Sequence, residues 1–321
     1  IVVYGFMKII FVVNPQAGKG KGIDKLKDRI NRVAESTGIP AGFYLTKSVG
    51  DAESFAKMAA SEALDRGEEI RFIACGGDGT LNEILNGVIG YDNASVGVMP
   101  IGTGNDFVRN FPDAGDFMDV EAQLKGEVTK IDLIRYEGIL DGRVQQRYCA
   151  NMFNIGFDCN VVDLAGRLKQ YPLLTGSAAY MAAVVGILVK KKGADLKIQL
   201  DDQLVHQGPL LLTALANGSY CGGGVKSSPK ADMKDGLMDV NIIYNVSRRE
   251  FIGKFPYYAK GTHLELDNID RIIYFKQCKK AVITPLSKTM RLCTDGEIVD
   301  AEEVAMEVVP GAANIILPKI L

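Results

Sequence analysis

Residues 75–83, CGGDGTLNE, decide the fold of this chain, because they join an apolar run to a helical pattern through a glycine-rich turn. The run at residues 70–74 is typical of a buried strand, and residues 81–88 carry the apolar spacing of a helix. Glycines at 76, 77 and 79 let backbone amides approach an anion, and a helix N-terminus favours phosphate through its unpaired amides and its dipole. Thr80 and Glu83 have the spacing of a capping box.

Asp78 lies among these glycines and needs a separate explanation. A carboxylate beside phosphate is repulsive unless a divalent cation lies between them or the carboxylate takes a proton in the reaction. The stretch therefore predicts magnesium-assisted phosphate chemistry. The alternative is a glycine turn that caps a helix and leaves Asp78 in solvent.

Length and composition indicate a globular protein of two domains. The chain has 321 residues, a length that exceeds the usual size of a single core. Its residues are 47% hydrophobic and 24% charged, as in globular proteins. A net charge of −2 gives no reason to expect nucleic acid as a partner. The six cysteines contain no CxxC pair, so neither a zinc site nor a disulfide framework is indicated, and a reducing cytoplasm fits best. Residues 1–6 are expected to be an extension ahead of the strand that begins at Met7.

The N-terminal part alternates strand and helix patterns. Strands are expected at residues 9–13, 43–45, 70–74 and 96–99, with Asp51 capping the helix after the second strand. Repeated βα units predict an α/β domain with a largely parallel sheet, whose ligands bind beyond the carboxyl ends of the strands. Three glycine-bearing loops are expected at that edge, at residues 14–22, 76–80 and 100–107.

After about residue 131 the pattern changes to short strands separated by turns, which predicts a mainly antiparallel β-sandwich. The strand-like runs include residues 130–136, 144–152, 238–243 and 271–275. We expect a first domain at residues 7–134 and a second at 135–304. The terminal run VAMEVVPGAANIILP reads as strand, turn and strand, so residues 305–321 could return to the first domain.

An uncharged run at residues 173–189 precedes three lysines, but it is only weakly apolar. It is expected to form a buried or interfacial helix rather than a membrane span.

Several rival motifs are missing. The sequence contains no GxxxxGK[ST], GxGxxG, GxSxG or HExxH motif. With only His206 and His263 present, a mechanism centred on histidine is not indicated, and His263 is expected to be structural.

Further motifs carry a resemblance to a known family. NPQAGKG, GGDGTLNE, GTGNDF, KADMKDGLMDV and a late DGE occur in the order seen in bacterial soluble lipid kinases of the diacylglycerol kinase catalytic-domain family. The resemblance runs from about Met7 to the C-terminus. It implies a nucleotide-binding parallel sheet like that of phosphofructokinases and NAD kinases, followed by a lipid-substrate sandwich domain. It also implies ATP and Mg²⁺ as cofactors.

The same resemblance assigns roles to individual residues. Asp78 and Asp106 would arrange the magnesium ion and the phosphates, and Glu297 would be the general base that takes a proton from the lipid hydroxyl. Asp78 remains a competing candidate for that base. The residues expected at the nucleotide are Asn14, Pro15, Gly18, Thr46, Gly76, Gly77, Asp78, Gly79, Thr80, Leu81, Asn82, Glu83, Thr103, Asn105 and Asp106.

A second, structural magnesium site is implied in KADMKDGLMDV. Its ligands would be the Asp235 carboxylate and backbone oxygens at Asp232 and Leu237, with Asp132 nearby through water. Oxygen ligands suit a hard cation. The alternative is an ordinary DG turn between strands.

The sequence therefore predicts an ATP- and magnesium-dependent lipid kinase, with diacylglycerol converted to phosphatidic acid as the expected reaction. Another lipid, a soluble acceptor such as NAD, or a non-catalytic lipid-binding role are the alternatives. Aromatic residues within 251–264, with Arg248, Arg249, Lys254 and Lys260 around them, could rest on an anionic membrane surface. Such a protein would be cytoplasmic and peripheral at the membrane, and a homodimer stays open.

Overall fold

The computed structural model describes residues 7–20, 22–112, 114–157, 159, 161 and 193–319. The expected extension at residues 1–6 and the expected helix at 173–189 lie outside the described residues. The chain forms two compact units, residues 1–131 with 311–321, and residues 132–310. Among the helices that are described, none combines the length and the apolar character needed to cross a membrane.

The first unit is built on a parallel sheet in the order β4-β3-β1-β2. Its C-terminal residues add a parallel pairing, because Ile315 pairs with Val96 of β4. The strands that start this sheet are β1 (Met7–Val13), β2 (Ala41–Leu45), β3 (Glu69–Gly76) and β4 (Ala94–Pro100). The predicted α/β domain with a parallel sheet is confirmed.

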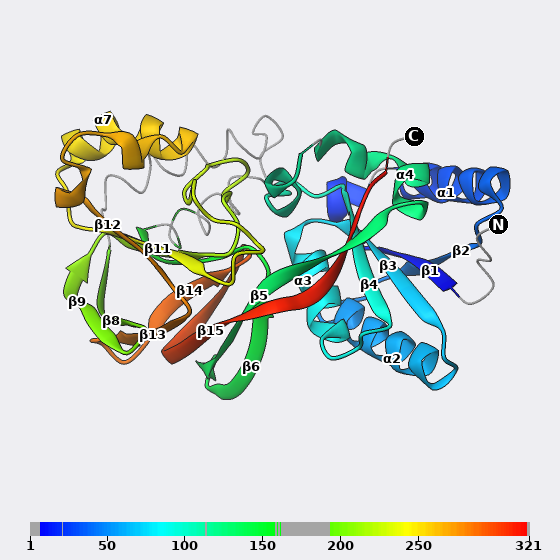
Figure 1. The fold of residues 1–321 in the computed structure, drawn as a ribbon, viewed down its shortest axis with the longest axis horizontal. Helices are drawn as coiled ribbons and strands as arrows, with labels where there is room; N and C mark the ends of the chain where they lie inside the picture. The colour runs from blue at the N-terminus through cyan, green and yellow to red at the C-terminus, as the bar shows by residue number, and fades with distance from the viewer. Residues whose placement is uncertain are drawn as a thin grey trace. The chain divides into compact units, whose positions relative to one another are not determined.

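Helices cover both faces of this sheet, as Figure 1 shows. Alternate residues of a strand face opposite sides of the sheet. Phe11 of β1 packs in a cluster with Ile30 of α1 on one side. Phe72 of β3 meets Phe55 of α2 edge-on on the other side, with ring centroids 6.4 Å apart. The helices are α1 (Ile23–Thr37), α2 (Asp51–Asp65), α3 (Asp78–Val88) and α4 (Val120–Leu124), with short 3₁₀ turns η1 (Ala17–Gly20), η2 (Phe107–Asn110) and η3 (Ala114–Met118).

The second unit is the predicted antiparallel β-sandwich. One sheet has the order β12-β11-β10-β7-β14, and β6, β5, β15, β13, β8 and β9 follow one another in the other. The strands are β5 (Glu127–Leu140), β6 (Arg143–Cys149), β7 (Met152–Gly156), β8 (Ala194–Leu200), β9 (Gln203–Leu210), β10 (Leu212–Ala216), β11 (Met238–Ile243), β12 (Ile273–Cys278), β13 (Lys280–Pro285), β14 (Met290–Thr294) and β15 (Glu297–Leu317).

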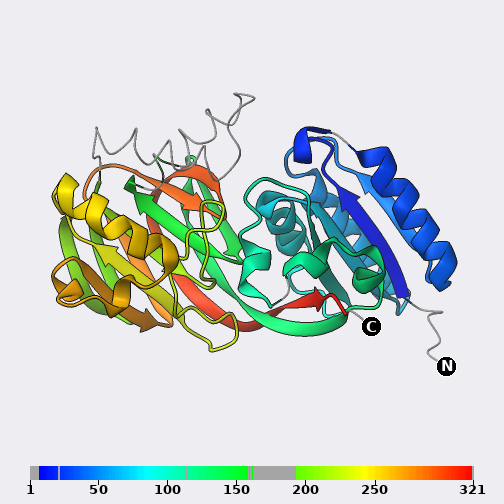
Figure 2. The same cartoon turned by 90° about the horizontal axis from the view of Figure 1, so that it is seen from above.

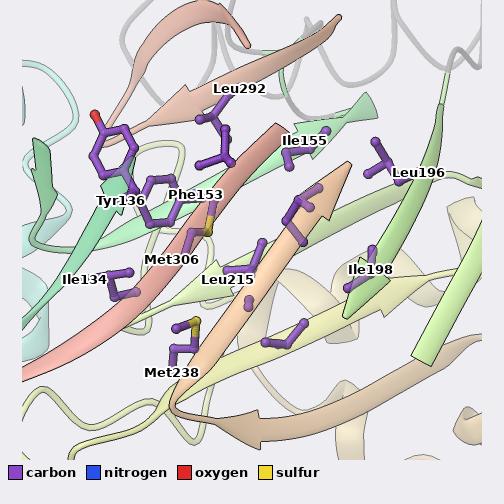
Figure 3. Packing of buried hydrophobic residues seen from close by; sticks show 14 of the residues in the cluster. Ile134, Tyr136, Phe153, Ile155, Leu196, Ile198, Leu215, Met238, Leu292 and Met306 are labelled. Carbon is purple, nitrogen blue, oxygen red and sulfur yellow. The ribbon is translucent and has the colours of Figure 1, made fainter. Parts of the chain in front are cut away.

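Apolar side chains from both sheets form one buried cluster in this unit, which includes Phe153, Leu215, Met238 and Met306 (Figure 3). Helix α7 (Arg248–Lys260), with η4 (His263–Glu265) and η5 (Ile269–Arg271), packs in a second cluster together with Leu212, Ile243 and Ile273. Figure 2 shows α7 lying along the outside of the sheet that contains β11 and β12. The sandwich therefore has a helix over one outer face.

Two strand predictions were wrong. The single strand expected at residues 144–152 is divided into β6 and β7, because the backbone bends at Ala150 and Asn151 and its amides bind the Asp295 carboxylate. The expected turn near Pro310 does not form, since β15 continues from Glu297 to Leu317. Gly311 takes φ +59° within that strand, a conformation that glycine adopts without strain.

Candidate active site

The three glycine-bearing loops meet at the carboxyl ends of β1, β3 and β4. The Asn14 backbone amide donates to the Cys75 carbonyl at 3.0 Å, and its side-chain amide donates to Thr80 Oγ1 at 3.3 Å. Gly18 lies close to the third loop, because a Cβ added to it would stand 3.3 Å from the Ile101 carbonyl oxygen. One edge of the sheet therefore collects the backbone amides of all three loops.

The second and third loops touch through their glycines. The Gly102 amide donates to the Gly76 carbonyl at 2.9 Å, and a Cβ at residue 102 would be 2.4 Å from the Gly77 Cα. Any side chain at residue 102 would therefore push the loops apart. Gly76 is required for a similar reason, since a Cβ there would be 2.2 Å from Thr80 Oγ1.

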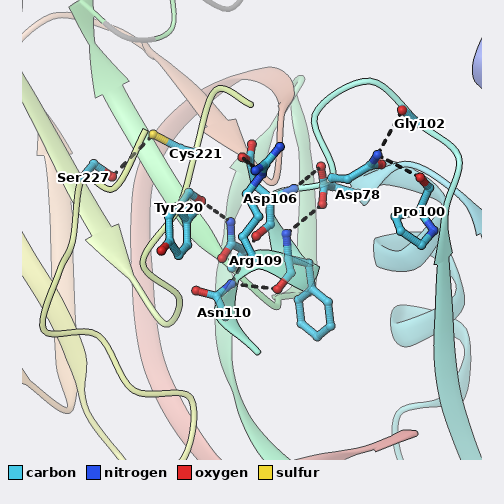
Figure 4. A network of polar contacts seen from close by, with 12 residues as sticks. Asp78, Pro100, Gly102, Asp106, Arg109, Asn110, Tyr220, Cys221 and Ser227 are labelled. Carbon is cyan, nitrogen blue, oxygen red and sulfur yellow. Dashed lines mark hydrogen bonds and ion pairs between the residues drawn. The ribbon is translucent and has the colours of Figure 1, made fainter. Parts of the chain in front are cut away.

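Asp78 and Asp106 lie at this contact (Figure 4). The Asp78 carboxylate accepts hydrogen bonds from the backbone amides of Asp106, at 3.2 Å, and Phe107, at 3.1 Å. Asp106 is 8% exposed and pairs with Arg109 at 3.7 Å. A Cβ on Gly104 would be 3.2 Å from Asp78 Oδ2 and 3.5 Å from Asp106 Oδ2, so both carboxylates border this glycine. Two carboxylates beside glycine amides suit a divalent cation that bridges to phosphate.

Asn105 holds the third loop in shape. Its φ is +52°, and its side-chain amide donates to the carbonyls of Pro100 and Gly102, both at 3.0 Å. Its Oδ1 is buried and has no hydrogen-bond partner within the part of the chain that the structure describes. An acceptor with this lack of a partner fits a site that a ligand or a hydrated cation completes.

A cavity of about 320 Å³ opens on the side of the first loop. It is lined by Asn14, Pro15, Gln16, Thr46, Lys47, Ser48, Val49, Ala52, Thr80 and Glu83. Five of these residues were predicted from the sequence to contact the nucleotide: Asn14, Pro15, Thr46, Thr80 and Glu83.

Glu83 does not close a capping box with Thr80, so that prediction was wrong. Helix α3 begins at Asp78 with Gly77 as its N-cap, which places Thr80 inside the first turn. Glu83 Oε2 instead accepts a hydrogen bond at 3.1 Å from the Ala52 amide, near the start of α2. The carboxylate therefore joins two helix N-terminal regions, and no local spacing could show this.

Three other residues that were predicted at the nucleotide are not among those that line this cavity. Leu81 is buried in the core, and the buried Asn82 accepts a hydrogen bond from Asn86 one helical turn later. Thr103 is exposed in the third loop.

The predicted helix cap at Asp51 was wrong. Gly50 is the N-cap of α2, and the Asp51 carboxylate accepts a hydrogen bond from the Lys47 amide at 2.7 Å.

Glu297 lies in the second unit, at the first position of β15. Asp295 and Gly296 form the two-residue turn before it, with φ +48° and +92°, and Thr294 pairs directly with Glu297. Positive φ at both turn positions is the type I′ hairpin that a DG pair favours. The Glu297 side chain is exposed.

Asp295 anchors this turn, and the sequence reasoning missed it. Its Oδ1 accepts from the amides of Asn151 and Met152, and its Oδ2 accepts from the Ala150 amide, all at 3.0 Å. The DG pair was a signal for the turn itself. The amide partners come from a bend about 144 residues earlier, which a turn motif does not reveal.

The residues proposed for a structural cation also come together in the second unit. Buried Asp132 accepts from the Gly236 amide at 2.7 Å, and the Asp235 carboxylate accepts from the Leu237 amide at 2.9 Å. Partial loss of water around the exposed Asp235 raises the pKa of its carboxyl, and the charges of Asp232 and Asp132 raise it further. Excess negative charge of this kind fits a cation held by one carboxylate and backbone oxygens. Across the described ranges, no three His, Cys, Asp or Glu side chains form a metal-binding group.

Glycine loops that gather two carboxylates at the end of a parallel sheet, followed by a β-sandwich, are the arrangement expected of an enzyme that transfers phosphoryl groups. Residues 8–136 match the family model of the diacylglycerol kinase catalytic domain, and residues 151–317 match that of the YegS C-terminal NAD kinase beta sandwich-like domain. The chain belongs to this diacylglycerol kinase catalytic-domain family, which confirms the resemblance seen in the sequence.

Named relatives agree with this assignment, and a solved structure shares the fold. A protein named diacylglycerol kinase from Staphylococcus haemolyticus is 31% identical over 89% of this chain and 81% of its own length. A protein of the same name from Bacillus subtilis is 29% identical over 89% and 88% of the two chains. The crystal structure of a putative diacylglycerol kinase from Bacillus anthracis covers 97% of both chains with a TM-score of 0.71 at 22% identity, which supports the fold alone.

Proposed function

We propose that this kinase uses ATP and Mg²⁺ to phosphorylate a lipid hydroxyl, with diacylglycerol as acceptor and phosphatidic acid as product. The observation that carries the kinase assignment is the meeting of three glycine loops with Asp78 and Asp106. Phosphoryl transfer depends mainly on alignment and charge neutralisation, and this edge of the sheet supplies amides for the first and carboxylates for the second.

The residues of the first unit divide the nucleotide between them. In this proposal the nucleoside binds in the cavity beside Asn14 and Thr46. The phosphates bind at the amides around Gly76 and Gly77. Asp78 and Asp106 would hold Mg²⁺, which neutralises the phosphate charge when bound. Because two backbone amides fix the Asp78 carboxylate, it is oriented before the nucleotide arrives.

Glu297 is the better candidate for the general base. Asp78 already accepts two amide hydrogen bonds and would also hold Mg²⁺, and a carboxylate engaged in this way is a poor acceptor for the proton of the lipid hydroxyl. Glu297 is exposed and follows a turn that Asp295 ties to three backbone amides. A carboxylate whose backbone is held in this way could take the proton from an acceptor hydroxyl as that oxygen attacks the γ-phosphoryl group.

The names of relatives support a lipid acceptor. Curated relatives of this chain carry the name diacylglycerol kinase.

The six cysteines support a location in the cytoplasm. All six are free and buried, and free cysteines are the rule in reducing compartments. We place the enzyme there, where it would reach lipid at the inner face of the membrane.

The test is phosphoryl transfer from labelled ATP to lipids in detergent micelles, with products identified by mass spectrometry. Diacylglycerol, a sphingoid base and phosphatidylglycerol are compared with NAD as a soluble acceptor. Phosphatidic acid is the expected product, and Asp78→Asn should abolish it. Asp65→Asn is the matched control, because Asp65 is exposed in the same unit and outside the loop contact. Phosphorylation of NAD alone would refute the lipid assignment, and no product from any acceptor would refute catalysis.

A further inference from the structure

Helix α7 has two faces with different surroundings. Phe251, Phe255 and Tyr258 point into the cluster below the helix, where Phe251 lies 5.1 Å from the ring of Phe157. Ile252 and Tyr257 face the other way and are 61% and 45% exposed. The aromatic residues that the sequence grouped as one membrane-facing cluster are therefore divided, and most of them belong to the core.

Basic side chains accompany the two exposed apolar ones. Positions 249, 252, 253, 256, 257 and 260 fall on one side of the helix at 100° per residue and are all exposed. This side, which we call the α7 outer face, consists of Arg249, Ile252, Gly253, Pro256, Tyr257 and Lys260. Arg249 and Lys260 form no ion pair or side-chain hydrogen bond among the described residues, so their charges are available to a partner.

The charge of this helix differs from that of the chain. Within α7 there are four basic residues and one acidic residue, whereas the whole chain carries a net charge of −2. The single acid, Glu250, accepts a hydrogen bond at 2.9 Å from the Ser247 amide in the capping box that starts the helix. It is therefore engaged at the helix end, and at 100° per residue it borders the α7 outer face beside Tyr257.

The helix is also held firmly against the sheet. The capping box fixes its start, and Gly261, with φ +76°, ends it. Between these ends, Phe251 and Phe255 stack with ring centroids 5.5 Å apart. The outer face is thus presented in one orientation, without a need to fold when a partner binds.

We propose that the α7 outer face docks on the surface of an anionic phospholipid bilayer. Arg and Lys favour an anionic surface, while an exposed Ile and Tyr gain by entering the boundary between headgroups and acyl chains. A nucleic acid would use the same charges, but Tyr257 alone could stack on a base, while Ile252 and Pro256 offer apolar surface that a nucleic acid does not use. The inference goes beyond the proposed kinase activity, because docking requires neither nucleotide nor catalysis.

The test is cosedimentation of the full chain with vesicles in the absence of ATP. Vesicles of phosphatidylcholine with about one third phosphatidylglycerol are compared with pure phosphatidylcholine, and binding is expected only to the anionic vesicles. A basic residue near such a surface contributes about fivefold in affinity, so Arg249→Glu with Lys260→Glu should weaken binding at least about 25-fold. Ile252→Ser with Tyr257→Ser should weaken it about tenfold.

The control is Arg143→Glu with Lys288→Glu, which makes the same change of charge at exposed positions of the same unit. It should bind vesicles almost as the unchanged protein does, and equal melting temperatures would show that all variants fold. The proposal is overturned if the control loses as much binding as the α7 variant, or if pure phosphatidylcholine binds equally well. Tighter binding of a single-stranded RNA to the α7 outer face than of anionic vesicles would also overturn it.

Discussion

Replacing Gly102 by alanine tests whether the contact between two glycine loops is needed for phosphoryl transfer. The new Cβ would be 2.4 Å from the Gly77 Cα and 2.8 Å from the Gly77 nitrogen. Both are backbone atoms, so no side chain can rotate to make room. Ordinary van der Waals contact begins at about 3.4 Å, and the loops must therefore separate by about 1 Å.

The size of the effect follows from that displacement. Overpacking of this kind costs roughly 1–3 kcal/mol of stability. A shift of about 1 Å at a site that aligns reacting groups can lower the rate about a hundredfold. We therefore expect Gly102→Ala to lower kcat/KM for ATP about a hundredfold, with a lower melting temperature.

Two other glycines complete the series. A Cβ on Gly104 would be 3.2 Å from Asp78 Oδ2, a contact that a small movement relieves, so Gly104→Ala should have an intermediate effect. Gly115 is in the same unit with nothing within 4 Å of an added Cβ, and Gly115→Ala should change little. Kinase assays, ATP titrations and melting curves on the three variants provide the measurements. Activity of Gly102→Ala within twofold of the unchanged protein would refute the reasoning.

Three further predictions concern the second unit. Glu297→Gln should lower turnover about a hundredfold while ATP affinity is kept, and retained turnover would exclude Glu297 as the base. Burial lowers the pKa of His263 to about 4, so the folded state binds a proton at this imidazole more weakly than the unfolded state does. The neutral imidazole therefore costs the folded state nothing above about pH 6.5, and the loss of stability begins below that pH. As the pH falls from 6.5 through 4, His263 should lower the free energy of unfolding by up to about 3 kcal/mol. His263→Phe should therefore flatten that part of the profile of melting temperature against pH. An unchanged slope in this variant would contradict the prediction. In the absence of nucleotide, Mg²⁺ should raise the melting temperature of the protein more than that of Asp235→Asn, and equal gains would argue against a cation at this carboxylate.

Much of the first unit could be predicted from local patterns. Strands β1 to β4, the three glycine loops and the place of Asp78 follow from apolar runs and from residues that permit positive φ or close backbone approach. These features depend on neighbours in the sequence, and such neighbours are visible without a structure.

The misplaced features have long-range causes. Glu83 has the spacing of a capping residue, yet its partner is the Ala52 amide of another helix. The break between β6 and β7 depends on Asp295, which meets those amides only after the sandwich has formed. In both cases a side chain satisfies a backbone group that is distant along the chain, so a local pattern could not assign the pair.

The sequence by itself therefore determined the class of this protein, because backbone conformation at glycine loops and apolar periodicity are local properties that motifs record. Only the tertiary structure decided which side chains those loops bring together and which face of α7 is left for a partner. Phe251 and Ile252 are neighbours of similar hydrophobicity, and nothing in their order shows that one is packed and the other exposed. The difference arises because the core covers one side of a helix, and burial is a property of the packed molecule.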